Sequence, residues 1–479
     1  MELNKNILIR NGLALLNSGF LILKPLVIVY FVNNYFGNEA YGQLSLFLSS
    51  LSAMSLLTSF GTNISMRRFL PTEEDLLTKR RLFYRPIFFQ LGALSILSAF
   101  LFLSLPLIFN ELKIYQVFIF VFYYFSFVLF NYFLEYRRFT NDIYNYTKYS
   151  LTFSAIYVSS LIGLLFTNSI SEIFQILILE SSAMFIMFIF LFTGIIKQVG
   201  FGLEFFRKDK LKTEIKKGLP QNISELSEII IVSADRYIVA ALLTIAEAGI
   251  YVTSYFLGSV PLLLIRVMGL VMPQLMFLER DKGSDKGVEN ILDIEIFVFC
   301  FLSIPYLMVV IFAGNEILEF FNIFSFQAHL SLIVISLATI FYGIYSILSV
   351  VALMELKTLN LMKMVIWFGF FNIILSLILI YITENFVSVA FSTLFTYVGL
   401  SCYFYLKMSS LWDYNIKFKS LSLLVCLALL SIMVSLLSAE YLNIPGLSKN
   451  HITLIVFFVL YSSFSSIYLY SQKVIKFVI

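Results

Sequence analysis

The chain has 479 residues, of which 60% are hydrophobic and only 13% are charged, and its mean hydropathy is +0.91. This composition excludes a soluble globular protein and indicates a polytopic membrane protein, in which each helical span takes about 20 apolar residues. The formal net charge of +4 is small, so the positions of the charges carry more information than their sum.

Apolar stretches divide the sequence into fourteen candidate spans. In chain order they cover roughly 10–33, 41–65, 86–109, 114–134, 148–168, 172–196, 219–243, 248–274, 291–314, 325–354, 364–383, 386–406, 420–439 and 452–472. The first apolar run, from Leu13 to Val32, is too long for a signal-peptide core and lacks a small-residue cleavage site, so we expect a retained span. The predicted fold class is an all-α membrane protein with about fourteen transmembrane helices.

The connectors between these spans alternate in charge. Those after even-numbered spans are basic, as at Arg67 and Arg68, whereas those after odd-numbered spans carry mostly acids such as Glu39 and Glu247. By the positive-inside rule the basic side is the cytoplasm. Because the number of spans is even, we predict that both termini lie there.

A faint internal repeat links the turns after the first and seventh spans. Aligning Glu39-Ala40 with Glu247-Ala248 sets an offset of 247 − 39 = 208 residues. The offset predicts two parallel six-helix lobes, 1–205 and 206–415, around a central cavity, with two extra C-terminal spans in 416–479. Parallel repeats of this kind are a recurring plan among transporters.

Two cations inside the predicted spans are candidates for binding an anionic substrate. Lys24 lies near the middle of the first span beside Pro25, and Arg266 lies in the second half of the eighth span. A charge in hydrocarbon costs roughly 2.5–3.5 kcal/mol on insertion scales, so it usually faces a wet cavity or a partner. Two such cations would neutralise a diphosphate. The alternatives are that Lys24 snorkels to the interface and that Arg266 pairs structurally with an acid.

The seventh span is the most polar helix, and its polar residues lie on one face. At 100° per residue they fall within an arc of about 140°. These residues are Asn222, Glu225, Glu228, Asp235 and Arg236. We interpret Arg236 as a third candidate cation for the diphosphate, and the others as cavity-lining groups or ligands of a coupling proton or sodium ion. Alternatively, Glu225 and Glu228 simply reach water and Asp235 pairs with a neighbouring cation.

Glu180 is the remaining charged candidate, in the sixth span beside Ser181 and Ser182. Its carboxylate either hydrogen-bonds to the next helix or titrates. Signatures of an enzyme or a metal site are missing from the sequence: the three cysteines are isolated in apolar runs, and no Walker motif occurs. We therefore expect no enzyme, no metal and no cofactor apart from a coupling H⁺ or Na⁺.

Several short motifs in order resemble the polysaccharide-transport branch of the multidrug, oligosaccharidyl-lipid and polysaccharide exporter superfamily, which contains the O-antigen and capsule repeat-unit flippases. The N-terminal half contributes Phe36-Gly37-Asn38-Glu39-Ala40-Tyr41-Gly42 and Gly61-Thr62 followed by Arg67-Arg68. Around the seventh span the motifs are Lys217-Gly218-Leu219-Pro220, Asp235-Arg236-Tyr237 and Glu247-Ala248-Gly249-Ile250-Tyr251.

This resemblance implies an alternating-access flippase of the bacterial cytoplasmic (inner) membrane. Its substrate would be an undecaprenyl-diphosphate-linked oligosaccharide repeat unit of O-antigen, that is of lipopolysaccharide, or of capsular polysaccharide. Lys24 and Arg266 match, by span, cavity cations of the related lipid II flippases. Membrane lipid is an implied partner, a polysaccharide polymerase and a chain-length regulator are open as protein partners, and nothing points to nucleic acid. The alternatives are a multidrug/ion antiporter or lipid II flippase of the same superfamily, and then a membrane polymerase or glycosyltransferase.

Overall fold

The computed structural model describes residues 2–63, 66, 70, 75–108, 114–140, 142–167, 172–200, 208–269, 272–354, 358–412, 418–441 and 453–462. Over these residues every regular element is a helix, with fourteen helices labelled α1 and α3 to α15. Eight of the described helices are long and apolar enough to cross a membrane, or nine if the bent pair of α8 and α9 is one span. The predicted class, an all-α membrane protein of about fourteen helices, is confirmed.

The chain forms two compact units. Unit 1 contains residues 1–36, 43–234 and 358–367, and unit 2 contains 37–42, 235–357 and 368–479. The boundary between the units therefore lies inside helix α7, between Ala234 and Asp235. The lobe limits predicted from the internal repeat, 1–205 and 206–415, stay a prediction.

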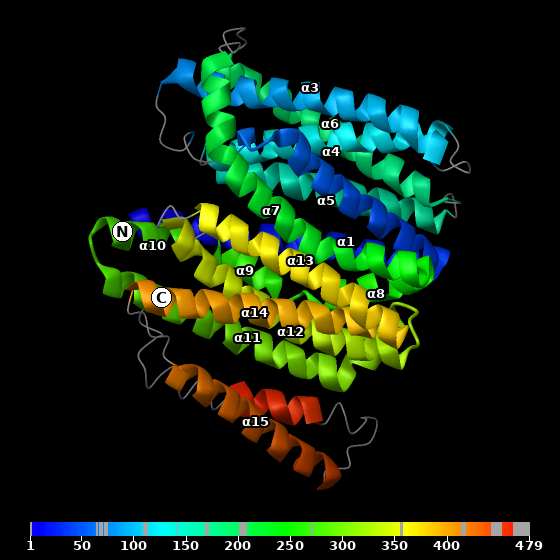
Figure 1. Ribbon diagram of the computed structural model, residues 1–479, viewed down its shortest axis with the longest axis vertical. Helices are drawn as coiled ribbons and strands as arrows, with labels where there is room; N and C mark the ends of the chain where they lie inside the picture. The colour runs from blue at the N-terminus through cyan, green and yellow to red at the C-terminus, as the bar shows by residue number, and fades with distance from the viewer. Residues whose placement is uncertain are drawn as a thin grey trace. The chain divides into compact units, whose positions relative to one another are not determined.

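Unit 1 is built from the first helices of the chain. They are α1 (Glu2–Ser59), α3 (Leu76–Ile108), α4 (Ile114–Phe139), α5 (Ile143–Phe166), α6 (Ile173–Val199) and most of α7 (Lys208–Leu242). Helix α4 packs against α3, α5 and α6, and these four helices lie side by side (Figure 1). Helix α1 contains the first two predicted spans, which meet at Gly37, where φ is 84°. A residue with a Cβ rarely adopts this φ, so a glycine is favoured at the kink.

Unit 2 is centred on α12 (Phe326–Met354), which packs against α8, α9, α11 and α14 (Figure 1). The remaining helices of the second half are α8 (Ile245–Gly258), α9 (Leu262–Met268), α10 (Met272–Asp281), α11 (Asp285–Phe320), α13 (Thr358–Thr383), α14 (Val387–Trp412) and α15 (Phe418–Tyr441). A last apolar helix, Thr453–Ser462, packs on α11 through Tyr461, whose ring stacks on Phe301 at 5.6 Å.

Glycines bring two turns of unit 2 together at van der Waals distance. A Cβ on Gly249 would lie 1.9 Å from the carbonyl oxygen of Asn38, and one on Gly42 would lie 2.2 Å from that of Ile245. These two glycines belong to the two turns that the sequence repeat aligned. Their backbones approach this closely because neither has a side chain.

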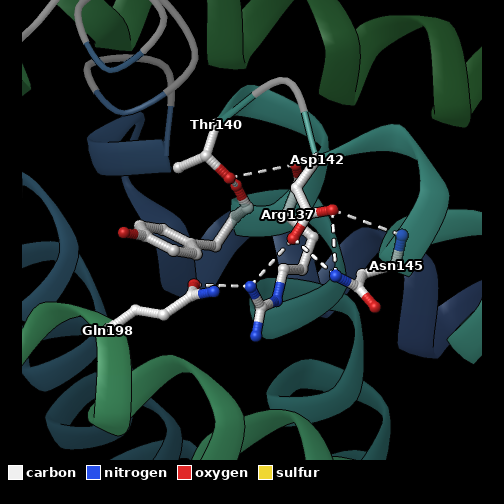
Figure 2. Close-up of polar contacts among 6 residues, drawn as sticks. Arg137, Thr140, Asp142, Asn145 and Gln198 are labelled. Carbon is white, nitrogen blue, oxygen red and sulfur yellow. Dashed lines mark hydrogen bonds and ion pairs between the residues drawn. The ribbon is translucent and has the colours of Figure 1, made fainter.

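A buried polar cluster joins α4, α5 and α6 at one end of unit 1 (Figure 2). The guanidinium of Arg137, which is 4% exposed, donates to the Asp142 carboxylate at 2.9 Å and to the Gln198 amide oxygen at 2.6 Å. Asn145 donates to the same carboxylate at 2.9 and 3.0 Å. The cluster fixes the ends of three helices relative to one another.

The first turn of α3 carries its own cap, just before the membrane-spanning segment. The backbone N–H of Thr78 donates to Asp75 at 2.9 Å, and the Thr78 hydroxyl donates to the same carboxylate oxygen at 2.7 Å. The hydroxyl and backbone hydrogen bonds from Thr78 lower the pKa of the exposed Asp75 carboxyl. This arrangement satisfies donors that a helix N-terminus otherwise leaves without a partner.

Candidate functional site

Lys24 and Glu180 form an ion pair within unit 1. Lys24 comes from α1 and Glu180 from α6, and their side chains are 17% and 5% exposed. The Lys24 ammonium also lies over two rings of α5, 4.8 Å from the centroid of Phe153 and 5.3 Å from that of Tyr157. One carboxylate and two aromatic faces therefore surround the ammonium group, which is the environment that a cation requires when it leaves water.

This pairing accounts for two predicted site residues at once. Glu180 hydrogen-bonds to a neighbouring helix, as one of the two sequence interpretations expected, and the cation that it meets is Lys24. An ammonium that is to bind an anionic substrate must be able to release its own carboxylate partner. A multivalent anion such as a diphosphate can compete with a single carboxylate for the ammonium. The predicted role of Lys24 in binding a diphosphate stays a prediction.

Asn222 links α7 to the C-terminal end of α1. Its amide nitrogen donates to the Leu56 carbonyl at 3.1 Å, and its amide oxygen accepts from the Ser59 hydroxyl at 3.2 Å. Both groups of the amide are thus used in packing two helices of unit 1. Cavity lining, the role expected from sequence, stays a prediction.

Glu225 and Glu228 are half-buried on the same helix. The amide nitrogen of Gln221 donates to Glu225 at 3.3 Å, one helical turn earlier. Both residues keep partial exposure, and their predicted role as cavity-lining or coupling-ion groups stays a prediction.

Asp235 is the most buried of the predicted site residues, with 0% exposure. Its carboxylate accepts hydrogen bonds from Tyr251 of α8 at 2.8 Å, from Ser376 of α13 at 3.3 Å and from Thr393 of α14. In the described part of the chain, all of its hydrogen bonds come from hydroxyl groups. The alternative in which Asp235 forms an ion pair with a neighbouring cation is not the arrangement seen here.

Further polar contacts join α13 and α14 near Ser376. Ser392 shares a hydrogen bond with Ser376, and the Asn372 amide donates to Thr396 at 3.3 Å. The amide oxygen of Asn372 is buried and has no hydrogen-bond partner among the described residues. The Asp235 carboxylate and its three hydroxyl partners are oxygen ligands of the kind that a proton or a hard cation prefers.

The partners of Asp235 were not among the residues predicted from sequence. They come from α8, α13 and α14, and those on α13 and α14 are more than a hundred residues from Asp235 in the sequence. Their signal in the sequence is weak, because single serines and threonines in apolar helices usually bond to their own backbone. Thr393 illustrates this, since its hydroxyl also lies 3.1 Å from the Val389 carbonyl of its own helix.

The two candidate arginines of unit 2 differ in environment. Arg236 follows Asp235 on α7 and is half-buried, with its guanidinium 5.7 Å from the ring centroid of Tyr255. Arg266 lies on α9, the short second half of a span that bends by 47°, and it is exposed. No described side chain forms an ion pair with Arg266, so the sequence alternative of a structural acid partner finds no support in the described residues.

The long apolar helices define a multi-pass membrane protein, and comparison with known proteins gives its family. Residues 8–276, which are more than half of the chain, match the family Polysacc_synt, described as polysaccharide biosynthesis protein. The protein therefore belongs to this family, and the predicted superfamily is confirmed. No curated protein matches the sequence.

Solved structures of the MOP superfamily share the fold. The lipid II flippase MurJ in an inward closed conformation has 16% identity and a TM-score of 0.66, over 97% of this chain and 99% of that chain. A MOP superfamily transporter from Pyrococcus furiosus has 13% identity and a TM-score of 0.62, over 83% and 93%. The Vibrio cholerae MATE transporter VcmN has 11% identity and a TM-score of 0.62, over 87% and 99%. At these identities the likeness establishes the fold alone.

Proposed function

We propose that this protein flips an undecaprenyl-diphosphate-linked oligosaccharide repeat unit, of O-antigen or capsular polysaccharide, from the cytoplasmic to the external leaflet of the bacterial inner membrane. The observation that carries the proposal is the family, polysaccharide biosynthesis protein, together with a likeness to a lipid II flippase over almost the whole of both chains. A lipid-linked, anionic sugar substrate is consistent with both findings.

The charges inside the spans support an anionic headgroup. Lys24, Arg236 and Arg266 are the proposed diphosphate ligands, because ammonium and guanidinium donors both neutralise phosphate and hydrogen-bond to its oxygens. Arg266 is exposed, so its guanidinium is accessible to a ligand. Lys24 has one counter-ion, Glu180, which the diphosphate would replace.

The oxygen cluster around Asp235 supports ion coupling. A proton or sodium ion bound there would neutralise a carboxylate that has no basic partner among its hydrogen bonds. With both termini in the cytoplasm, as the charge distribution predicts, export of an anion is also favoured by the membrane potential, by about 2.3 kcal/mol per charge per 100 mV. Rocking of two lobes would carry the substrate across.

The experiment is a deletion of the gene in its host, complemented at matched expression with the wild-type protein, Lys24→Ala or Arg266→Ala. We expect lipid-linked repeat units to accumulate on the cytoplasmic leaflet of the deletion strain, and the Arg266 variant to fail to rescue surface glycan. Unchanged surface glycan on deletion, in a strain without a paralogue, would remove this substrate from consideration.

A multidrug/ion antiporter is the second candidate, since solved MATE transporters share the fold. The buried carboxylate at Asp235 is compatible with this function, because a coupling ion needs such a group. Drug susceptibility of the same deletion strain separates the two candidates: an antiporter predicts increased susceptibility with normal glycan. If the protein were instead a membrane polymerase or glycosyltransferase that acts outside, its deletion would leave the lipid-linked unit on the external leaflet.

A further inference from the structure

The span formed by α8 and α9 is broken by a short, tightly wound segment. Its backbone hydrogen bonds connect residues three apart: Val260 to Leu257 at 3.2 Å, Leu262 to Ser259 at 3.0 Å, Leu263 to Val260 at 3.0 Å and Leu264 to Pro261 at 3.1 Å. This is the 3₁₀ pattern, which inside a longer helix often marks a functional hinge. Beyond it, the axis of α9 departs from that of α8 by 47°.

Pro261 causes the break through the hydrogen bond that it cannot make. Proline has no N–H, so the Leu257 carbonyl loses its donor four residues later. The Leu262 N–H donates to the Ser259 carbonyl, so the Gly258 carbonyl also lacks its usual α-helical donor. The Leu257 carbonyl keeps the Val260 N–H at 3.2 Å as a donor in the tighter 3₁₀ pattern. In a membrane span, where water is scarce, further donors to these two carbonyls stabilise the break.

Two side chains from neighbouring helices donate to these carbonyls. The Tyr306 hydroxyl of α11 donates to the Leu257 carbonyl, and the Thr339 hydroxyl of α12 donates to the Gly258 carbonyl at 2.9 Å. Thr339 is fully buried, and its hydroxyl also lies 3.0 Å from the Ser336 carbonyl of its own helix. A Cβ on Gly258 would lie 2.8 Å from Ile335, so α8 and α12 approach closely at the break.

We infer that Tyr306 and Thr339 are positioning residues that hold this span broken and thereby set the direction of Arg266, five residues after Pro261. The inference deepens the proposed function, because it matters for transport only if Arg266 binds the headgroup. A 3₁₀ helix turns by about 120° per residue and an α-helix by about 100°, so each residue of the tightly wound segment that changes from one to the other rotates Arg266 by about 20° about the axis. Loss of the Thr339 hydroxyl frees the Gly258 carbonyl to accept from the Leu262 N–H and so favours this change, whereas loss of the Tyr306 hydroxyl removes a donor that helps to fix the break.

The structural part is tested with a cysteine reporter that needs no transport. Arg266→Cys is introduced after Cys300, Cys402 and Cys426 are replaced by serine, and its modification by a water-soluble methanethiosulfonate is timed in nanodiscs. We expect Thr339→Val and Tyr306→Phe to change the rate about fivefold or more, the order expected for one lost hydrogen bond. Ser336→Ala is the matched control, since that hydroxyl donates to Leu332 in its own helix at 2.7 Å.

Pro261→Ala separates the proposed role from general packing. This variant supplies the N–H that an α-helix donates to the Leu257 carbonyl, and a helix that continues through residue 261 also returns the Leu262 N–H to the Gly258 carbonyl. It should therefore change the rate by itself, and Thr339→Val or Tyr306→Phe should then add almost nothing. The inference would be overturned if Thr339→Val and Tyr306→Phe changed the labelling rate equally with and without the Pro261→Ala substitution. It would also be overturned if neither variant changed the rate in the protein that keeps Pro261.

Glycan export with the native Arg266 then distinguishes the two proposals. Altered labelling with reduced export supports both. Altered labelling with normal export upholds the positioning role and contradicts the proposed role of Arg266, whereas unaltered labelling contradicts the positioning role whatever the export result.

Discussion

Lys24 and Glu180, which are 156 residues apart in the sequence, form an ion pair between α1 and α6. The pair places a positive charge inside unit 1 without leaving it uncompensated. The Glu180 carboxylate and two aromatic rings of α5 surround the ammonium, so the ion pair carries no net charge. An incoming diphosphate would exchange one anion for another.

Breaking this pair from one side should be more harmful than removing both charges. Lys24→Met leaves the Glu180 carboxylate buried without its counter-ion, and we expect it to lower the free energy of unfolding by about 3 kcal/mol. The double variant Lys24→Met/Glu180→Gln should recover most of this loss. Unfolding of the purified variants in mixed micelles measures both values, and additive losses in the double variant would show that the two side chains do not interact.

The cluster around Arg137 should be a second stabilising point of unit 1. Arg137→Met removes charge-assisted hydrogen bonds to Asp142 and Gln198, and we expect a loss of about 2 kcal/mol in the same measurement. Arg138→Met is the matched control, because its ion pair with Glu135 is 39% and 32% exposed and should contribute less than about 1 kcal/mol. Equal losses for the two arginine variants would contradict the account of this cluster.

The close approach of the two glycine turns in unit 2 should not tolerate a methyl group. Gly249→Ala would place a Cβ 1.9 Å from the Asn38 carbonyl, so we expect destabilisation of about 2 kcal/mol or more. Gly163→Ala, in helix α5, meets nothing within 4 Å and should be neutral or stabilising by up to about 1 kcal/mol. If thermal unfolding gives both alanine variants the same midpoint, the two turns do not pack as described.

Asp235 should make stability depend on a monovalent cation. A proton needs only the carboxylate, whereas a sodium ion also uses neighbouring oxygens such as those of Thr393 and Ser376, so we expect NaCl to raise the unfolding temperature above that in choline chloride. Asp235→Asn should abolish the difference, and Thr393→Val should reduce it. A sodium effect that persists in Asp235→Asn would place the ion elsewhere, and a response to pH alone would favour proton coupling.

Composition and hydropathy predicted the class and the helices, because burial in a bilayer leaves a strong apolar pattern. What they could not give is where a span bends. The kink of α1 at Gly37 and the break at Pro261 depend on single residues and on donors from other helices, such as Thr339, which no local pattern reveals.

The same limit applies to the candidate site. Charges within spans identified Lys24, Glu180 and Asp235 because each is costly in hydrocarbon and therefore conspicuous. Their partners are tertiary: Glu180 meets Lys24 across the bundle, and the hydroxyl donors of Asp235 come from three other helices. Resemblance supplied the substrate class, which neither charge nor periodicity specifies.

Transport by the purified protein tests the central claim most directly. Vesicles containing the protein and a fluorescent undecaprenyl-diphosphate-linked oligosaccharide are treated with a glycosidase that cannot cross the membrane, and the protected fraction is followed over time. We expect the protected fraction to fall toward zero with the wild-type protein and to remain near half of the label with Arg266→Ala or in protein-free vesicles. A protected fraction that remains near half with the wild-type protein, under an imposed membrane potential and a sodium or proton gradient, would contradict the proposed flippase.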